Sequence, residues 1–353
     1  MARWSPSERL VVLGAGATRG AQFVHDDAPP LCLPPLNTDF FTQLQRITAA
    51  KHERDVSNVL EDVLTLYGPN FDLTLEQYFT QLEAMIATID ASSSSTVKFS
   101  VERLNIMRGH LLNGLSAVLE QSADVAKANS KPRRSPCAYH AGLVDLLDPR
   151  DTIISFNYDC IIDHALRTSG NNKWSARYGY CFPNPDRVEG YQTWDAVDPP
   201  TRHNASINLL KLHGSLNWFP FPADGTGSIR LRERPYKQGG NKEYEIIPPE
   251  YVKTFDKRPI FKRLWTNAEL AIRKARTIVF IGFSFTPTDL HVEALFRVAL
   301  ADKPGLQHVI IVNPSHEHRR RIRTILSEPL RRGARVTQFD LFREAYPHLP
   351  DLC

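Results

Sequence analysis

His213 lies in the stretch NLLKLHGSLNW, residues 208–218, and is the residue whose type and position most suggest chemistry. A histidine side chain can take a proton from water or from a sugar hydroxyl near neutral pH. Apolar residues lead up to Leu212, and Gly214 and Ser215 follow the histidine. A single histidine is more often structural than catalytic, so its role depends on the polar groups that the fold brings beside it.

A polar pair, Asn157 and Asp159, follows the apolar run TIISF at residues 152–156. The asparagine offers a donor and an acceptor, and the aspartate can accept from a ribose diol or a backbone amide. A turn that caps the next helix accounts for the pair equally well.

Glycines follow the first apolar run, in VVLGAGATRG at residues 11–20. Gly14, Gly16 and Gly20 would let a backbone approach a phosphate closely, with a helix N-terminus behind it. Their spacing has one residue more than the dinucleotide fingerprint G-x-G-x-x-G, and a tight turn without a ligand explains them nearly as well. The four prolines of residues 26–41 predict a loop next, in a position to fold over a bound nucleotide.

Two further clusters follow apolar runs nearer the C-terminus. Gly282, Ser284 and Phe285 come after TIVFI, and small or hydroxyl residues there could bond phosphate or ribose. Asp289 is at least as well explained as the cap of the next helix. Asn313 follows the apolar run VIIV in VIIVNPS. It could contact a ribose or simply form a turn before Pro314.

The elements that must position these clusters are short buried strands. Apolar runs occur at residues 10–13, 152–156, 207–212, 277–283, 308–312 and 335–340, and helical patterns at 261–275 and 289–300 separate some of them. Continuous apolar runs suit strands that are buried on both faces, so we predict a doubly wound, Rossmann-like α/β fold with a parallel sheet. Ligands bind at the carboxyl ends of such strands, which would place all the clusters along one crevice.

Residues between the first two strands have a different pattern. Apolar residues recur at helical spacing from about residue 45 to 130, which predicts roughly three amphipathic helices that bury one face against the sheet. We therefore expect a discontinuous α/β domain of residues 1–44 and 137–353, with a helical insertion of residues 45–136. Residues 181–205 and 219–255 are rich in proline, glycine and aromatics and are predicted to be long loops over the sheet.

The composition is that of an ordinary globular protein, with 353 residues, 42% hydrophobic and 23% charged residues and a net charge of +4. No apolar run is long enough to span a membrane, so we expect a cytoplasmic protein. The five cysteines form no C-x-x-C pair, and the His316 and His318 pair has no third ligand nearby, so no metal site is predicted. The basic segment 316–335 is best explained as a solvated helix face, which makes direct nucleic-acid binding unexpected.

Taken together, the clusters resemble the sirtuin (SIR2) fold family. GAGATRG resembles its GAG-x-S loop with Thr18 in place of serine, FNYD its glutamine-asparagine-x-aspartate element, and LHGS its histidine-glycine motif. GFSF is similar to its glycine-x-serine loop and VNP to its adenosine-side asparagine. SFNYD, KLHGSLNW and IGFSF are more similar to the SIR2-like domains of bacterial antiphage defence systems than to protein deacylases. The chain also lacks the two cysteine pairs of the deacylases' zinc module.

The resemblance implies a sirtuin-like fold without a zinc module and an enzyme that hydrolyses NAD to nicotinamide and ADP-ribose. It implies that Asn157 positions water or ribose, that His213 is the general base, and that Asp159 orients the nicotinamide ribose or the Asn157 loop. Implied contacts to the diphosphate come from Gly14, Ala15, Gly16, Ala17 and Thr18, and contacts to the adenosine half from Gly282, Ser284, Phe285 and Asn313. Asp39 and Phe40, in NTDFF, echo an aspartate-phenylalanine element that lies near nicotinamide in the family.

Three other functions compete with hydrolysis. The protein could be a sensor that binds NAD or ADP-ribose without turnover, an NAD-dependent deacylase, or a structural subunit that grips a partner through its basic segment. Because a hydrolase that is always active would deplete its host of NAD, we expect gating by homo-oligomer assembly or by a partner. In similar two-protein systems that partner is a HerA-type ATPase or a short Argonaute. The helical insertion is the expected assembly surface.

Overall fold

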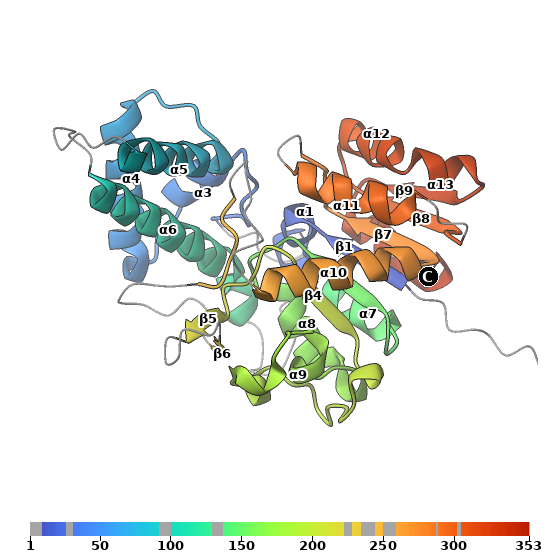
Figure 1. Ribbon diagram of the computed structural model, residues 1–353. Coiled ribbons are helices and arrows are strands. Elements are labelled where there is room, and N and C mark those ends of the chain that lie inside the picture. The colour runs from blue at the N-terminus through green and yellow to red at the C-terminus, as the bar shows by residue number, and fades with distance from the viewer. Residues whose placement is uncertain are drawn as a thin grey trace, which may run out of the picture.

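The structure is a computed structural model that describes residues 9–25, 31–91, 100–128, 137–221, 228–233, 244–249, 259–286, 289–301 and 305–352. Its centre is a six-stranded parallel sheet with the strand order β4-β2-β1-β7-β8-β9 (Figure 1). The strands are β1 (Arg9–Leu13), β2 (Thr152–Ser155), β4 (Asn208–Lys211), β7 (Thr277–Ile281), β8 (His308–Val312) and β9 (Arg335–Phe339). Each strand coincides with one of the predicted apolar runs, and the predicted doubly wound α/β fold is confirmed.

The strand order reverses between β1 and β7. From β1 the chain builds the sheet outward through β2 and β4, then returns to the other side of β1 and continues through β7, β8 and β9. Leu13 pairs with Ser155 on one side and with Ile281 on the other. The carboxyl ends of β1 and β7 therefore form the topological switch point at which such sheets bind ligands.

Helices with apolar stripes pack around the sheet. Phe261, Leu264, Ala268 and Ile272 recur every three or four residues along α10 (Pro259–Lys274), and all four are buried. The other helices beside the sheet are α7 (Ala138–Leu146), α8 (Ile161–Ser169), α11 (Leu290–Leu300), α12 (His316–Ile325), α13 (Ser327–Arg331) and α14 (Phe342–Ala345). Four further helices are only four or five residues long: α1 (Ala15–Arg19), α2 (Gln22–His25), α9 (Ala176–Gly179) and α15 (Leu349–Leu352).

A second helical group lies at one side of the molecule (Figure 1). It comprises α3 (Phe40–Gln45), α4 (Glu53–Tyr67), α5 (Leu75–Ala91) and α6 (Val101–Ala128). The buried residues of these helices form a core of their own with Leu216, Phe219, Tyr244 and Ile246, rather than packing on the six-stranded sheet as expected. The helices carry enough apolar surface to cover one another. Whether residues 45–136 fold as a separate unit stays a prediction.

A small second sheet forms within the region that was predicted to be loops. Its strands β3 (Val188–Glu189), β6 (Ser228–Leu231) and β5 (Trp218–Phe221) lie in that order, with β5 antiparallel to β6. They are short and separated by turns, which hides the alternating pattern that would reveal them in the sequence. In the part of the chain that the structure describes, no helix is long and apolar enough to cross a membrane.

Candidate functional site

A cavity of about 500 Å³ lies at the carboxyl ends of five strands of the large sheet. Its lining includes ten of the predicted site residues: Gly14, Ala15, Gly16, Thr18, Asn157, Asp159, His213, Gly282, Ser284 and Asn313. These residues come from segments that are far apart in the sequence, and the parallel strands bring them to one edge.

Four predicted site residues do not border the cavity. Ala17 and Phe285 are buried in the core around the sheet, and Phe40 is buried in the core of the helical group. The Asp39 carboxylate accepts hydrogen bonds from the backbone amide of Leu36 and from Gln43, and it pairs with Arg19. Their side chains are occupied by packing or by the turn before α3, and their expected contacts with a ligand stay predictions.

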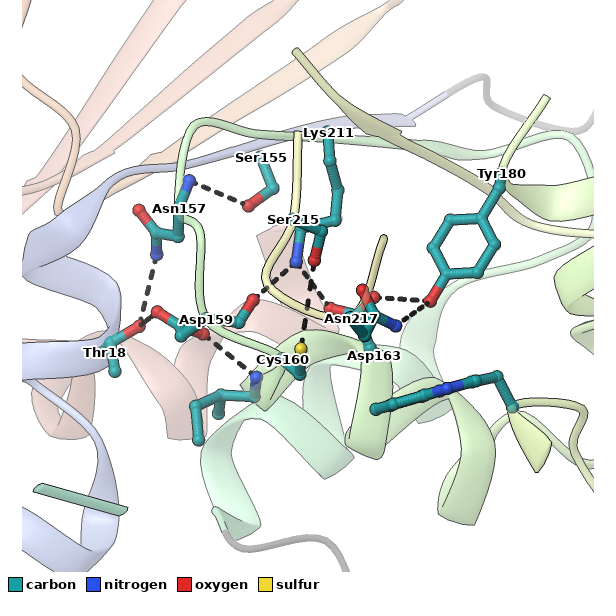
Figure 2. A network of polar contacts seen from close by, with 12 residues as sticks. Thr18, Ser155, Asn157, Asp159, Cys160, Asp163, Tyr180, Lys211, Ser215 and Asn217 are labelled. Atoms are coloured by element: carbon teal, nitrogen blue, oxygen red, sulfur yellow. Dashed lines mark hydrogen bonds and ion pairs between the residues drawn. The ribbon is translucent and has the colours of Figure 1, made fainter. Parts of the chain in front are cut away.

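Asn157, Thr18 and Asp159 form a continuous hydrogen-bonded chain (Figure 2). Asn157 Nδ2 donates to the carbonyl oxygen of Gly14 at 2.9 Å and to Thr18 Oγ1 at 3.2 Å. The Thr18 hydroxyl donates in turn to Asp159 Oδ2 at 2.8 Å. The amide hydrogens of Asn157 are therefore used by the protein, and its carbonyl oxygen Oδ1 remains for a ligand.

The Asp159 carboxylate is oriented into the protein as much as toward the cavity. Its Oδ1 accepts from the backbone amide of Ile161 at 3.0 Å, at the start of α8. Burial raises the pKa of Asp159, while the Lys211 ammonium, the Ile161 amide and the Thr18 hydroxyl act in the opposite direction. Of the two implied roles for Asp159, these contacts favour that of holding the Asn157 loop.

The glycines serve the close approach of two loops at the switch point. Gly16 donates its backbone N–H to the carbonyl oxygen of Gly282 at 3.0 Å. A Cβ atom on Gly282 would lie 2.0 Å from the backbone nitrogen of Ala17, and the φ angle of Gly282 is +58°. A Cβ atom on Gly14 or Gly16 would come within 2.8 Å of the Gly282 backbone. Glycine is required here by backbone contact, whether or not a phosphate binds.

His213 lies two residues after the end of β4 and is 6% exposed. Its ring lies edge-on to Phe156, with ring centroids 5.1 Å apart, and tilted against Tyr158 at 6.3 Å. The carbonyl oxygen of His213 accepts a hydrogen bond from the Ile247 amide at 2.9 Å, and Gly214 has a φ angle of +81°. The imidazole is thus held by two aromatic rings that are adjacent in sequence to Asn157.

Hydroxyl, carboxylate and imidazole groups line the cavity beyond β7 and β8. Asn313 Nδ2 donates to the carbonyl oxygen of Phe283 at 3.0 Å, and its Oδ1 accepts from the Ser315 amide at 2.9 Å. These contacts make Asn313 a turn residue as well as a lining residue. The remaining members of this group are Thr286, Asp289, Ser315 and His318. Sequence reasoning named Asp289 mainly as the cap of the next helix and did not assign the other three to the site.

The helical group supplies another wall of the cavity, whereas its helices were expected to bury one face against the sheet. Leu75 and Glu76 of α5 and Leu115 and Leu119 of α6 border it. The proline-rich loop lies beside them, with Pro34, Pro35, Leu36, Asn37 and Thr38 in the lining. Asn37 Oδ1 accepts from the Glu76 amide at 2.9 Å, so loop and helix are joined. Only the predicted placement of the loop over the crevice hinted at this wall.

The cavity is lined by glycines on one side, by leucine side chains of α5 and α6 on another, and by a few polar groups. Small-molecule sites usually have this mixed lining. Among the described residues no group of three or more histidine, cysteine, aspartate or glutamate side chains could hold a metal ion. The described lining offers hydrogen-bond donors and acceptors, the imidazoles of His213 and His318, and aromatic and aliphatic side chains that can exclude water.

The chain was compared with known proteins and with protein families. A solved structure described as a Sir2 homolog–NAD complex is similar at 12% identity, covering 98% of this chain and 89% of that chain, with a TM-score of 0.42. No curated protein matches the sequence. The family model of the SIR2-like domain matches residues 151–330, which is more than half of the chain and includes Asn157, His213 and Gly282. The protein therefore belongs to the SIR2-like domain family.

Proposed function

We propose that this protein hydrolyses NAD, releasing nicotinamide and ADP-ribose. The observation that carries the proposal is that a single cavity at the switch point borders the glycine loop, Asn157 and His213 together. Membership of the SIR2-like family supports NAD as the ligand. A diphosphate would lie along the Gly14–Gly282 cleft, with the adenosine half toward Ser284 and Asn313 and the nicotinamide half toward Asn157 and His213.

The reaction breaks a C–N bond to a leaving group that is already cationic, so it needs no strong acid. It needs a fixed ribose, stabilisation of an oxocarbenium-like transition state and one water molecule. The Asn157 Oδ1 oxygen would accept a hydrogen bond from that water or from a ribose hydroxyl. His213 would take the proton as the water attacks, and the Phe156 and Tyr158 rings would keep other water away from the imidazole.

The test is to incubate the purified protein with NAD and to follow nicotinamide and ADP-ribose by chromatography. We expect release by the wild type and a loss of at least about 100-fold in His213→Ala, because a positioned general base contributes that much or more. His316→Ala is the matched control, since His316 is exposed at the start of α12. Equal loss in both variants would argue against a specific role for His213.

Three other functions would give different outcomes when NAD binding is measured beside nicotinamide release. Binding of NAD or ADP-ribose without nicotinamide release, in every mixture, would replace hydrolysis by a sensor function. Release that depends on an added acyl-lysine peptide would indicate deacylation. The structural role of a subunit that only grips a partner would show neither binding nor release.

We further propose that hydrolysis serves antiphage defence by depleting NAD in the infected cell. Support comes from the sequences of the motifs SFNYD and KLHGSLNW, which are more similar to those of defence-type SIR2 domains than to those of deacylases. Gating by self-assembly, or by a partner such as a HerA-type ATPase or a short Argonaute, is part of this proposal. Cellular NAD should fall after infection in cells with the wild type and hold steady with His213→Ala. Light scattering with and without the partner would report assembly.

A further inference from the structure

Lys211 is a charged residue at the end of a strand whose two preceding residues are leucines. It is the last residue of β4, two positions before His213, and its side chain is fully buried. Its Nζ donates a hydrogen bond to the backbone carbonyl oxygen of Asp159 and lies 2.9 Å from Asp163 Oδ2 (Figure 2). A lysine at this depth is unusual, because removing an ammonium group from water is costly unless it is paired.

The ion pair is completed by neutral groups. Asp163 Oδ1 accepts from the Tyr180 hydroxyl at 2.5 Å, and Asn217 Nδ2 donates to that hydroxyl oxygen at 3.3 Å. Burial opposes the charge on Lys211, but the Asp163 carboxylate, together with Cys160 and Asp159, raises the pKa of Lys211 above its ordinary value. The lysine is therefore held as an ammonium with its hydrogen bonds directed.

Packing alone does not call for this charge. A buried ion pair can often be replaced by apolar residues of similar volume with little loss of stability. What an apolar residue would lack is the hydrogen bond to the Asp159 carbonyl oxygen. That bond matters because Asp159 is also bonded to Thr18, which accepts from Asn157. One ammonium group thus connects the strand that carries His213 to the turn that carries Asn157.

We propose that Lys211 is a positioning residue for the reaction, one that fixes the Asn157–Asp159 turn against β4 and so sets Asn157 relative to His213. The inference rests on the proposed hydrolysis of NAD. It assigns a role to a residue that does not border the cavity and touches no substrate.

Three variants separate positioning from stability. Lys211→Met removes the ammonium and leaves Asp163 buried and unpaired, so both the melting temperature and kcat should fall. Asp163→Asn leaves a group at position 211 that still donates to Asp159, so the melting temperature should fall while kcat stays near the wild-type value. The double variant Lys211→Met/Asp163→Asn removes both charges, so the melting temperature should recover while kcat stays low.

The melting temperature should drop by roughly 5 to 10 °C in each single variant, since each leaves an unpaired buried charge. In Lys211→Met and in the double variant kcat should fall by about 10- to 100-fold at a temperature where all proteins are folded, because misplacing a reacting group by about 1 Å costs that much. KM should change little. If kcat follows the melting temperature through the series, or if only KM changes, Lys211 is merely structural.

Crystal structures of the wild type and the double variant test the inference without an assay. The turn at residues 157–159 should shift relative to β4 in the double variant, and an unchanged turn would overturn the inference. If the wild type never releases nicotinamide, the proposed hydrolysis is wrong. The crystal structures would still show whether Lys211 fixes the turn at residues 157–159.

Discussion

Asn157 has two kinds of polar atom, and the fold uses them differently. The amide nitrogen donates to the Gly14 carbonyl oxygen and to Thr18, while none of the described residues donates a hydrogen bond to the amide oxygen, and the residue borders the cavity. An aspartate has nearly the same shape but no hydrogens to donate. Replacing Asn157 by aspartate therefore tests whether the hydrogen bonds from its amide nitrogen stabilise the site.

Asn157→Asp should lower the free energy of unfolding by at least about 2 kcal/mol, because it removes the donor to Thr18 and one of the two donors to the Gly14 carbonyl oxygen, and it buries a second charge beside Asp159. Affinity for ADP-ribose should fall as well. Denaturant unfolding and calorimetric titration measure the two effects. Asn105→Asp makes the same chemical change on the exposed face of α6, where Asn105 Nδ2 donates to the Val101 carbonyl oxygen, and should have little effect. Similar losses in both variants would contradict this account of Asn157.

At the same scale, the sequence identified the groups that could do chemistry but not those that hold them. His213, Asn157 and Asp159 stand out because polar residues follow apolar runs, and the cavity collects all three. Lys211 gave no signal, because a lysine within an apolar run looks like a strand residue that reaches solvent. Its pairing with Asp163 depends on the packing of α8 against β4, which no local pattern reveals.

At the scale of elements, the loops after β1 and β7 can touch only because glycines stand at the point of contact. Gly282 has a positive φ angle, which other residues rarely adopt. A Cβ atom added at this position would clash with the backbone of Gly16 and Ala17. The two loops meet directly over the switch point, so a displacement here would change the cavity floor.

Gly282→Ala should lower the free energy of unfolding by roughly 3 kcal/mol or more, through a strained backbone and overpacking, and should weaken ADP-ribose binding. Gly109→Ala is the matched control. Gly109 lies within α6 with no atom near the position of a Cβ, so alanine should raise stability by up to about 1 kcal/mol. Thermal melting and ligand titration of both variants give the comparison, and a stable, ligand-binding Gly282→Ala would disprove the requirement for glycine.

Elements with strong local patterns were predictable, and those that depend on partners were not. Five strands of the large sheet were predictable because they are almost wholly buried and so read as apolar runs. The sixth, β9, is partly exposed and contains polar residues, so its pattern was weaker. The strands of the small sheet were missed because they are two to four residues long and lie among turns. The helices at 53–128 were expected, but their packing on one another was not, since a helical pattern shows an apolar face without naming its neighbour.

For the molecule as a whole, the main finding is that the cavity lies between two packing units. The large sheet provides its floor, and α5, α6 and the proline-rich loop provide a wall. Leu119 belongs at once to the core of the helical group and to the lining of the cavity. Any change in how the helices sit against the sheet would therefore alter the site.

Leu119→Trp should project extra volume into the cavity and weaken ADP-ribose binding by at least about tenfold, which is 1.4 kcal/mol. Ile106→Trp places the same side chain on an exposed position of α6 and should leave affinity unchanged. Titration calorimetry with both variants, after confirming their melting temperatures, provides the measurement. Unaltered affinity in Leu119→Trp would mean that the ligand does not approach this wall.

The pairing of β1 with β7 has a consequence for the time at which the protein becomes active. β1 is synthesised long before its partner strand β7, which ends at Ile281, and the Gly16–Gly282 contact closes only after that. Domains form as their chain becomes available, and distant pairings cannot precede synthesis of the second strand. Under the proposed function, a nascent or prematurely terminated chain has no complete NAD-cleaving site, so translation itself delays the toxic activity until the sheet can close.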